Sequence, residues 1–237
     1  MIDHLPVLQV ALPLLAAPLC LLLRRAIAAW LLTWSLSGLA LVIAICLLVE
    51  VNARGVLSYA LGGWAAPWGI EYRLDAVNGF VLLIVSTIST VALLFARKSV
   101  LHEVAEDKQT LFYTAWLLCL TGLLGITVTG DAFNLFVFLE ISSLSSYVLI
   151  ALGRDRRALT AAFQYLVMGT IGATFILIGV GLLYMVTGTL NMVDLAERLP
   201  TVGDNRTVHT ALAFLTVGIG LKSVSYTHLT LPTNREV

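Results

Sequence analysis

The sequence contains few charged residues. Only 12% of its 237 residues are charged, whereas 59% are hydrophobic, and the 14 basic residues balance the 14 acidic ones. This composition is far from that of a soluble domain. Because no basic block stands out, the chain also offers no electrostatic surface for nucleic acid. The composition predicts a protein whose surroundings are the lipid bilayer and excludes a nucleic-acid-binding function.

Metal-binding and redox spacings are also missing. The cysteines stand singly in apolar segments, and the histidines show no spacing typical of metal ligands. No Ser/His/Asp constellation indicates an enzyme either, so we expect no metal, no cofactor and no catalytic cluster. Asp3 and His4 replace the basic start of a signal peptide, so the first span is expected to stay in the mature protein. The residues in question are Cys20, Cys46, Cys119, His4, His102, His209 and His228.

Long apolar runs dominate what is present. A spanning helix needs about 20 largely apolar residues, and seven segments reach or approach that length. The expected fold class is therefore an all-α polytopic bundle of about seven transmembrane helices. The segments are 6–23, 27–49, 76–95, 110–129, 132–152, 159–186 and one that begins near Val208.

The stretch "YALGGWAAPWGIEYRLD", residues 59–75, separates the second and third spans. Its glycines, its proline and its partial alternation predict a short β-hairpin or a re-entrant loop. Trp64, Trp68 and Tyr72 are suited to the membrane–water interface, where aromatic residues gather.

The basic residues predict an orientation. Loops after the first, third and fifth spans hold eight of them, and the opposite loops hold four. By the positive-inside rule, the N-terminus and the hairpin lie outside the cytoplasm, as expected for a multi-pass protein of a bacterial inner membrane. The eight are Arg24, Arg25, Arg97, Lys98, Lys108, Arg154, Arg156 and Arg157; the four are Arg54, Arg73, Arg198 and Arg206.

One carboxylate lies near the middle of the fifth span. Glu140 stands within "NLFVFLEISSLSSYVLI", residues 134–150, and a charge at that depth costs about 3 kcal/mol on insertion scales. Ser143 and Tyr147 share its helical face, because residues three and seven apart align. This pattern favours a proton or ion path over an ion pair that only holds helices together.

A lysine, Lys222, follows the apolar run of the seventh span in "LTVGIGLKS". The pattern leaves open whether it is buried at mid-depth or reaches the membrane surface. If Lys222 and Glu140 are both buried, Glu140 is the natural partner of the lysine. Two charges about 4 Å apart attract by about 4 kcal/mol at an effective dielectric of 20, which changes proton affinity about a thousandfold. Separating them would release the proton.

Two other patterns have structural explanations. The glycines of "GVGLLYMVTG", residues 179–188, resemble part of a dinucleotide-binding motif, but no strand precedes them, so we interpret them as helix-packing glycines. Asp131, at the start of the fifth span, is predicted to be a helix N-cap and not a proton site.

Four stretches resemble the D subunit of multisubunit Mrp-type monovalent cation/proton antiporters. The same superfamily includes the antiporter-like proton-channel subunits of respiratory complex I. The resemblance implies that Glu140 and Lys222 match the family's span-five glutamate and span-seven lysine, which gate proton movement, and that the hairpin lies on the outer face. The stretches are "YALGGWAAPWGIEYRLDAVNGFVLLI", "GDAFNLFVFLEISSLSSYVLIALG", "AAFQYLVMGTIGATFILIGVGLLYMVTGTLNM" and "GIGLKS".

The sequence departs from this family in two ways. Family members are about twice as long, with two inverted repeats, so residues 1–223 are expected to be the N-terminal half of such a membrane domain. After the lysine the family reads approximately Phe-Pro-x-His-x-Trp-Leu-Pro, whereas this chain reads "VSYTHLTLPTNREV". Residues 224–237 are therefore interpreted as a non-native tail, and His228 inherits no role.

The resemblance implies a subunit that couples proton flow to export of Na+ or another monovalent cation, with other antiporter subunits as partners. Two alternatives stay open. The first is a proton-pumping subunit of complex I or of a related membrane hydrogenase. The second is a noncatalytic scaffold in which Glu140 and Lys222 only join helices.

Overall fold

The computed structural model describes residues 4–23, 25–203 and 205–223. Within them the chain forms eight α-helices and one two-stranded antiparallel sheet, and six of the helices are long and apolar enough to cross a membrane. This confirms the predicted all-helical polytopic fold with a hairpin between its second and third spans. The elements are α1 (Leu5–Leu22), α2 (Ala26–Arg54), β1 (Leu57–Ala60), β2 (Glu71–Leu74), α3 (Ala76–Glu103), α4 (Gln109–Val128), α5 (Ala132–Ala151), α6 (Arg156–Thr187), α7 (Met192–Val202) and α8 (Arg206–Lys222).

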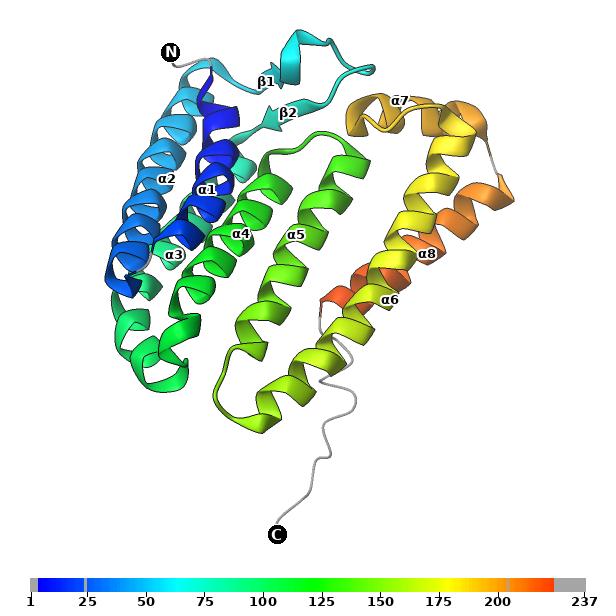
Figure 1. The fold of residues 1–237 in the computed structure, drawn as a ribbon. Helices are drawn as coiled ribbons and strands as arrows, with labels where there is room; N and C mark the ends of the chain where they lie inside the picture. The colour runs from blue at the N-terminus through cyan, green and yellow to red at the C-terminus, as the bar shows by residue number, and fades with distance from the viewer. Residues whose placement is uncertain (1–3, 24, 204, 224–237) are drawn as a thin grey trace.

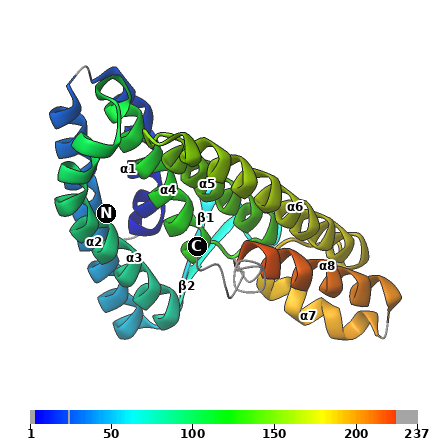
Figure 2. The same cartoon turned by 90° about the horizontal axis from the view of Figure 1, so that it is seen from below.

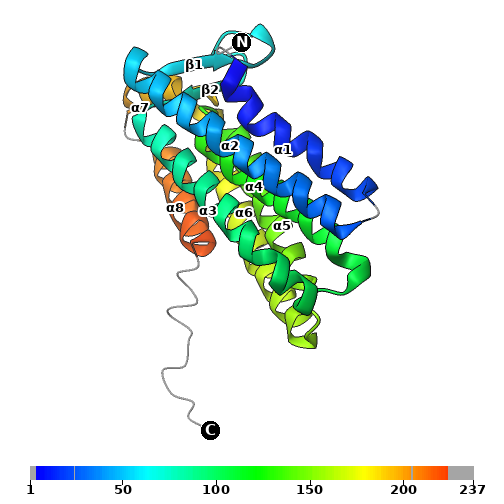
Figure 3. The same cartoon turned by 90° about the vertical axis from the view of Figure 1, so that its left-hand side faces the viewer.

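The helices fall into two groups joined by α5. Helices α1–α4 pack together, α6 and α8 pack against each other, and α5 lies between α4 and α6 (Figures 1 and 2). The hairpin, the α4–α5 connection and α7 lie at one end of the bundle, here called the hairpin end (Figures 1 and 3). The C-terminal end of α3 and the α5–α6 connection, which hold Arg97, Lys98 and Arg154, lie at the opposite end.

Side-chain caps fix where several helices begin. The Asp75 carboxylate accepts a hydrogen bond from the Asn78 backbone N–H at 2.9 Å, and the Asn78 side chain accepts one in return at 3.1 Å. This reciprocal capping box satisfies backbone donors that the first turn of α3 leaves open. Asp155 and Asn205 cap α6 and α8 in the simpler one-sided way. The polar residues between the spans therefore define the helix starts.

Two hydrophobic clusters hold the α1–α4 group together. One lies toward the hairpin end and contains Leu47, Leu74, Leu82, Leu120 and Leu124. The other lies toward the opposite end and joins α1, α3 and α4. Helix α4 contributes to both and is the most buried of the candidate spans. The α1–α4 group thus forms a packed wall beside α5.

Helices α2 and α3 run further than their apolar segments. Helix α2 continues to Arg54, where Arg54 forms an ion pair with Glu50 one turn earlier at 2.8 Å. Helix α3 continues through Arg97 and Lys98 to Glu103. The Arg97 guanidinium lies 5.1 Å from the centre of the Trp30 ring. Charged turns extend a helix beyond its apolar core because i,i+4 ion pairs and aromatic contacts stabilise them.

Helix α7 was not predicted. Its 11 residues are too short for a span, and polar residues and Pro200 interrupt its apolar positions. It begins at the Asn191 N-cap, whose side chain accepts hydrogen bonds from the backbone N–H groups of Val193 and Asp194. The pattern that identifies it is local: a capping residue followed by an amphipathic stretch.

Candidate functional site

Helix α5 presents Glu140, Ser143 and Tyr147 on one face, as the helical spacing predicted. Its rotation is set by contact with α4 on its other side. A Cβ atom at Gly122 would lie 2.5 Å from the Ser142 backbone nitrogen, and one at Gly125 would lie 2.3 Å from the Phe138 ring. Only glycine permits so close an approach. With Phe138 and Ser142 directed at α4, the face with Glu140 is directed at α6 and α8.

Helix α8 brings Lys222 to this face. The Lys222 Nζ lies 2.6 Å from Glu140 Oε1 and donates a second hydrogen bond to Ser143 Oγ at 2.9 Å. The side chains of Lys222 and Glu140 are 11% and 25% exposed. The sequence left the depth of Lys222 open, and the structure places it inside the bundle beside the carboxylate. A charge-assisted hydrogen bond of this length is short and strong.

A cavity adjoins the Lys222 ammonium. It has a volume of about 210 Å³, which is room for several water molecules. Tyr147 lines it and packs against Tyr165 of α6, with ring centres 6.2 Å apart. The remaining wall combines hydroxyl and thiol groups with a few apolar side chains: Cys119, Leu123, Ser142, Ser143, Ser146, Gly169 and Leu221. The predicted polar face of α5 is thus directed at a space that can hold water.

The sequence did not predict a second buried carboxylate. Glu71 of β2 is only 7% exposed. One of its oxygens accepts a hydrogen bond from the Ser58 hydroxyl and lies 3.9 Å from the Arg73 guanidinium. The other accepts one from Asn191 Nδ2 at 2.8 Å. The nearest signal was the alternation within the hairpin, which gives no information about a partner 120 residues away.

Backbone hydrogen bonds join three segments around Glu71. The Gly130 N–H donates to the Glu71 carbonyl, and the Met192 N–H donates to the Gly130 carbonyl, both at 2.8 Å. Isolated bridges pair Tyr72 with Thr129 and Asp131 with Asn191. We call the assembly of β2, residues 129–131 and residues 190–192 the hairpin clamp. It ties the α1–α4 group to α6 and α7 at the hairpin end.

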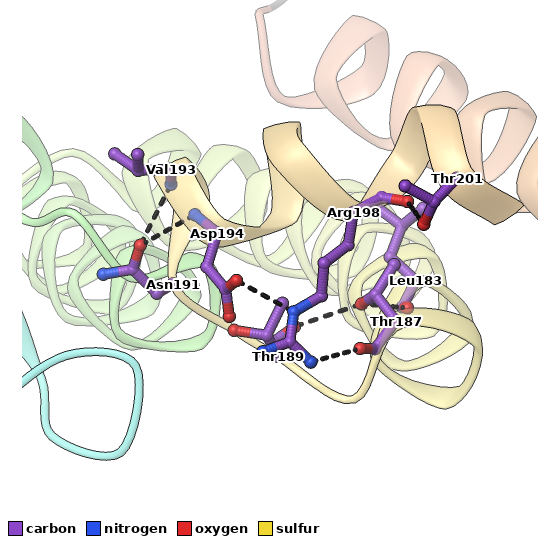
Figure 4. A network of polar contacts seen from close by, with 8 residues as sticks. All are labelled: Leu183, Thr187, Thr189, Asn191, Val193, Asp194, Arg198 and Thr201. Carbon is purple, nitrogen blue, oxygen red and sulfur yellow. Dashed lines mark hydrogen bonds and ion pairs between the residues drawn. The ribbon is translucent and has the colours of Figure 1, made fainter.

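Helix α7 is held at the end of α6 by Arg198 (Figure 4). Arg198 Nε donates to Asp194 Oδ1 at 2.8 Å, and Arg198 Nη1 donates to the Thr187 carbonyl at 3.1 Å. The hydrogen bond from Arg198 holds the pKa of Asp194 below its ordinary value. Gly188, with φ of 71°, then ends α6 in the left-handed conformation that glycine adopts without strain. The guanidinium is well placed there, since helix C-termini attract cations.

Asp131 is the N-cap of α5, as predicted. Its carboxylate accepts a hydrogen bond from the Asn134 backbone N–H at 2.7 Å. Burial raises the pKa of Asp131 above its ordinary value. The residue belongs to the hairpin clamp and lies more than two helical turns from Glu140 along α5, so it caps the helix outside the ion-pair site.

One aromatic expectation was wrong. Trp64 and Trp68 are exposed, at 70% and 90%, as suits an interfacial position, but Tyr72 is 3% exposed. Because β2 pairs with the α4–α5 connection, the Tyr72 ring faces the core and lies 6.5 Å from the Phe138 ring. Burial raises the pKa of Tyr72 to about 12.

The packing interpretation of residues 179–188 holds for only one glycine. A Cβ atom at Gly179 would lie 2.7 Å from Leu215 of α8, whereas one at Gly181 would meet nothing within 4 Å. Gly188 instead ends α6. In the described part of the chain, no three His, Cys, Asp or Glu residues group as metal ligands. His228 lies outside the described residues.

The fold and this site are those of a polytopic helical membrane domain in which a part-buried lysine–glutamate pair lies beside a cavity lined by hydroxyl and apolar groups. The family model described as "NADH:quinone oxidoreductase/Mrp antiporter, TM" matches residues 129–231, which include both members of the pair. The chain belongs to this family, and the resemblance seen in the sequence is confirmed.

Named relatives include two kinds of assembly. The chain is 42% identical to the N subunit of NADH-quinone oxidoreductase from Desulforudis audaxviator, over 94% of its own length and 44% of the relative's. It is 31% identical to the D subunit of the Na(+)/H(+) antiporter from Bacillus subtilis, over 93% of its own length and 44% of the relative's. It therefore spans less than half the length of these two curated relatives.

A solved structure agrees with this fold. The chain resembles a subunit of the membrane-bound sulfane sulfur reductase, an archaeal respiratory membrane complex, with a TM-score of 0.82 and 32% identity. The match covers 92% of this chain and 44% of the other. The arrangement of α1–α8 is therefore a recurring unit of larger membrane subunits.

Proposed function

We propose that this chain conducts protons within a multisubunit monovalent cation/proton antiporter of the Mrp type, as part of its D subunit. The observation that carries the proposal is the contact of Lys222 with Glu140 and Ser143 beside a cavity that hydroxyl groups and apolar side chains line together. A buried ionisable pair in a membrane is costly and marks ion or proton paths. Both members of the pair lie within the range that matches the family.

In the proposed mechanism Lys222 carries the proton and Glu140 sets its charge. The carboxylate lies 2.6 Å from the ammonium nitrogen and attracts it. When the two side chains separate, that attraction is lost and the amine releases its proton to water in the adjoining cavity. Ser143 gives the ammonium a second acceptor at 2.9 Å, so the lysine keeps a hydrogen bond while it leaves the carboxylate. Tyr147 supports the same polar face.

The basic loops predict how the protein is oriented in the membrane. We propose that the arginine-rich end faces the cytoplasm and that the N-terminus and hairpin lie outside, in the inner membrane of a bacterium. In support, α1 begins at the hairpin end, and Arg97, Lys98 and Arg154 lie at the other end (Figure 1). The test introduces a single cysteine at Trp68 or at Arg154 and treats intact cells with a membrane-impermeant thiol reagent. We expect the cysteine at position 68 to be labelled and the one at position 154 to be protected. Labelling at position 154 alone would show the opposite orientation.

The test of function uses the complete protein in everted membrane vesicles. Glu140→Gln and Lys222→Met are compared with Glu103→Gln and Lys98→Met, which change exposed residues at the far end of α3. Sodium-dependent proton movement, followed with a pH-sensitive dye, is expected to disappear in the first two and persist in the controls. Normal exchange by both site variants would overturn the proposed roles. Loss of the assembled complex in both would support the scaffold alternative.

The alternative function is a proton-pumping subunit of complex I or a related respiratory complex, driven by redox partners. The 42% identity to a NADH-quinone oxidoreductase subunit favours it. Purification of the complete complex separates the two: flavin and iron–sulfur subunits would accompany a respiratory subunit, and their absence together with cation-driven proton movement would support the antiporter. In the proposed mechanism the Glu140–Lys222 pair has the same role in both assemblies; for a respiratory subunit the same variants are compared by redox-driven proton movement instead of sodium-dependent movement.

A further inference from the structure

Two glycines of α6 lie against the site without taking part in its chemistry. Gly169 and Gly172 are three residues apart, so they share one helical face. A Cβ atom at Gly169 would lie 1.6 Å from the Tyr147 hydroxyl oxygen. A Cβ atom at Gly172 would lie 3.3 Å from Lys222 Cγ and 3.1 Å from Leu221 Cβ. Each glycine thus leaves room for one side chain of the proposed proton path.

We propose that Gly169 and Gly172 are positioning residues: the first seats the Tyr147 phenol beside the cavity, and the second seats the Lys222 stem within reach of Glu140. The inference rests on the proposed function. It concerns how the geometry is set, because neither glycine carries a group that binds a proton.

The two glycines act through different kinds of contact. At Gly169 the obstacle is the end of a tyrosine side chain, which can turn away and leave the fold intact. At Gly172 the obstacles include the Gly218 carbonyl oxygen at 3.1 Å, which is backbone of α8. A side chain at 172 therefore pushes the last turn of α8, with Lys222, away from α6. Small displacements matter because proton transfer needs donor and acceptor within hydrogen-bond reach.

The same helices provide matched controls. Gly181 of α6 and Gly220 of α8 have open space where a Cβ would lie, so alanine fits at both. A Cβ atom at Gly179 would lie 2.7 Å from Leu215, but Gly179 is about two helical turns from Gly172 and further from Lys222 along α6. Gly181→Ala and Gly220→Ala control for alanine in a helix, and Gly179→Ala controls for loosened packing between α6 and α8.

The first test is a double-mutant cycle in the complete protein in vesicles. Gly169→Ala and Tyr147→Leu are each expected to slow exchange about tenfold, and the double variant is expected to be no slower than either, because the glycine acts through the tyrosine. Additive losses would assign Gly169 a separate packing role and overturn its action through Tyr147. A Gly169→Ala rate equal to that of Gly181→Ala would overturn the assignment as well.

The second test compares pH profiles of exchange. Gly172→Ala is expected to shift the profile in the same direction as Glu140→Asp, because both lengthen the contact between Glu140 and Lys222. The other titratable groups that face the same cavity, Cys119, Tyr147 and Tyr165, are unchanged in both variants. Gly179→Ala lowers the amount of assembled protein without moving the profile. An unshifted profile in Gly172→Ala would overturn the role of Gly172.

These outcomes are separable from failure of the proposed function. Lys222→Met and Glu140→Gln are measured in the same vesicles. If they abolish exchange while the glycine variants behave like Gly181→Ala, only the positioning inference fails. If they leave exchange intact, the proposed function itself fails.

Discussion

Glu71 and Glu140 are both carboxylates withdrawn from water, yet their partners differ. Glu71 is 7% exposed and accepts hydrogen bonds from Ser58 and Asn191, with Arg73 nearby. Glu140, with a side chain 25% exposed, contacts Lys222 beside a cavity. Ser58 and Asn191 stay neutral across the physiological pH range, whereas the lysine side chain is long, flexible and titratable.

The difference separates a structural carboxylate from a switchable one. Ser58 and Asn191 each donate to one oxygen of Glu71, and the backbone hydrogen bonds of the hairpin clamp hold β2 and residues 190–192 in place. Loss of one contact there weakens the fold but moves no proton. At Glu140 a single contact joins two ionisable groups, and in the proposed mechanism breaking it changes proton occupancy. Substitutions at Glu71, at Glu140 and at their partners therefore test this contrast.

The largest effect is expected from paired amide substitutions. Glu140→Gln should lower exchange per assembled complex by more than about a hundredfold, because the lysine loses the charge that governs its proton. Glu71→Gln should leave that rate near normal but lower the free energy of unfolding by about 1–3 kcal/mol, because hydrogen bonds to a buried charge are weakened. Vesicle transport and thermal unfolding in detergent measure the two. Equal transport losses would erase the distinction.

Asn191→Ala should have the next largest effect. It removes the donor to Glu71 and the cap of α7 together, and an unsatisfied buried carboxylate oxygen costs about 1–3 kcal/mol. Asn205→Ala removes only the cap of α8 and should cost about 1 kcal/mol. Thermal unfolding of the two variants gives the comparison. If Asn205→Ala proved as costly, the link between Asn191 and Glu71 would carry no stability of its own.

Asp131 should give a smaller effect that depends on pH. Burial raises the pKa of Asp131 in the folded state, so the ionised carboxylate destabilises the fold. The contribution of Asp131 to stability is therefore greatest below its ordinary pKa of 3.8, and it falls as the pH rises through the raised pKa. Asp131→Asn keeps a capping oxygen and should remove this fall. Asp131→Ala should remove the fall too, and should be about 1 kcal/mol less stable than Asp131→Asn at all pH values because it lacks the cap. Unfolding midpoints between about pH 4 and 7 distinguish them; parallel curves for Asp131→Asn and the unchanged protein would contradict the assignment.

Arg198→Met should have the smallest effect. The Arg198 side chain is 45% exposed, and exposed ion pairs contribute little because water and salt screen them. We expect the unfolding midpoint to stay unchanged within measurement error at physiological salt. A fall as large as that of Asn191→Ala would show that the docking of α7 on α6 matters as much as the hairpin clamp.

The sequence predicted much of the membrane part, because long apolar runs and helical spacing are local signals. The six candidate spans, the hairpin and the Asp131 cap follow from such signals. The shared face of Glu140, Ser143 and Tyr147 follows from helical geometry alone. The sequence also indicated Lys222 as a possible partner of Glu140, but its surroundings did not decide its depth, and its role came from the family resemblance.

What the sequence did not predict depends on contacts between distant segments. Asn191 and Glu71 meet because the α6–α7 turn returns to the hairpin, and Tyr72 is buried because β2 pairs with Thr129. Gly169 has no local peculiarity within α6; its meaning appears only when the Tyr147 phenol occupies the space above it. Hydrophobic periodicity describes each helix by itself and contains no information about these neighbours.

The glycine contacts determine which parts of the site are free to move. Gly122 and Gly125 lock the backbone of α5 onto α4, and Gly179 and Gly218 interlock α6 with α8. Sliding or rotating α5 against α4, or α8 against α6, would disturb these close contacts. In the proposed mechanism the pair can therefore open by a change of lysine rotamer while the helices stay in place. Such a change takes picoseconds to nanoseconds where it is unhindered, far less than a helix shift requires.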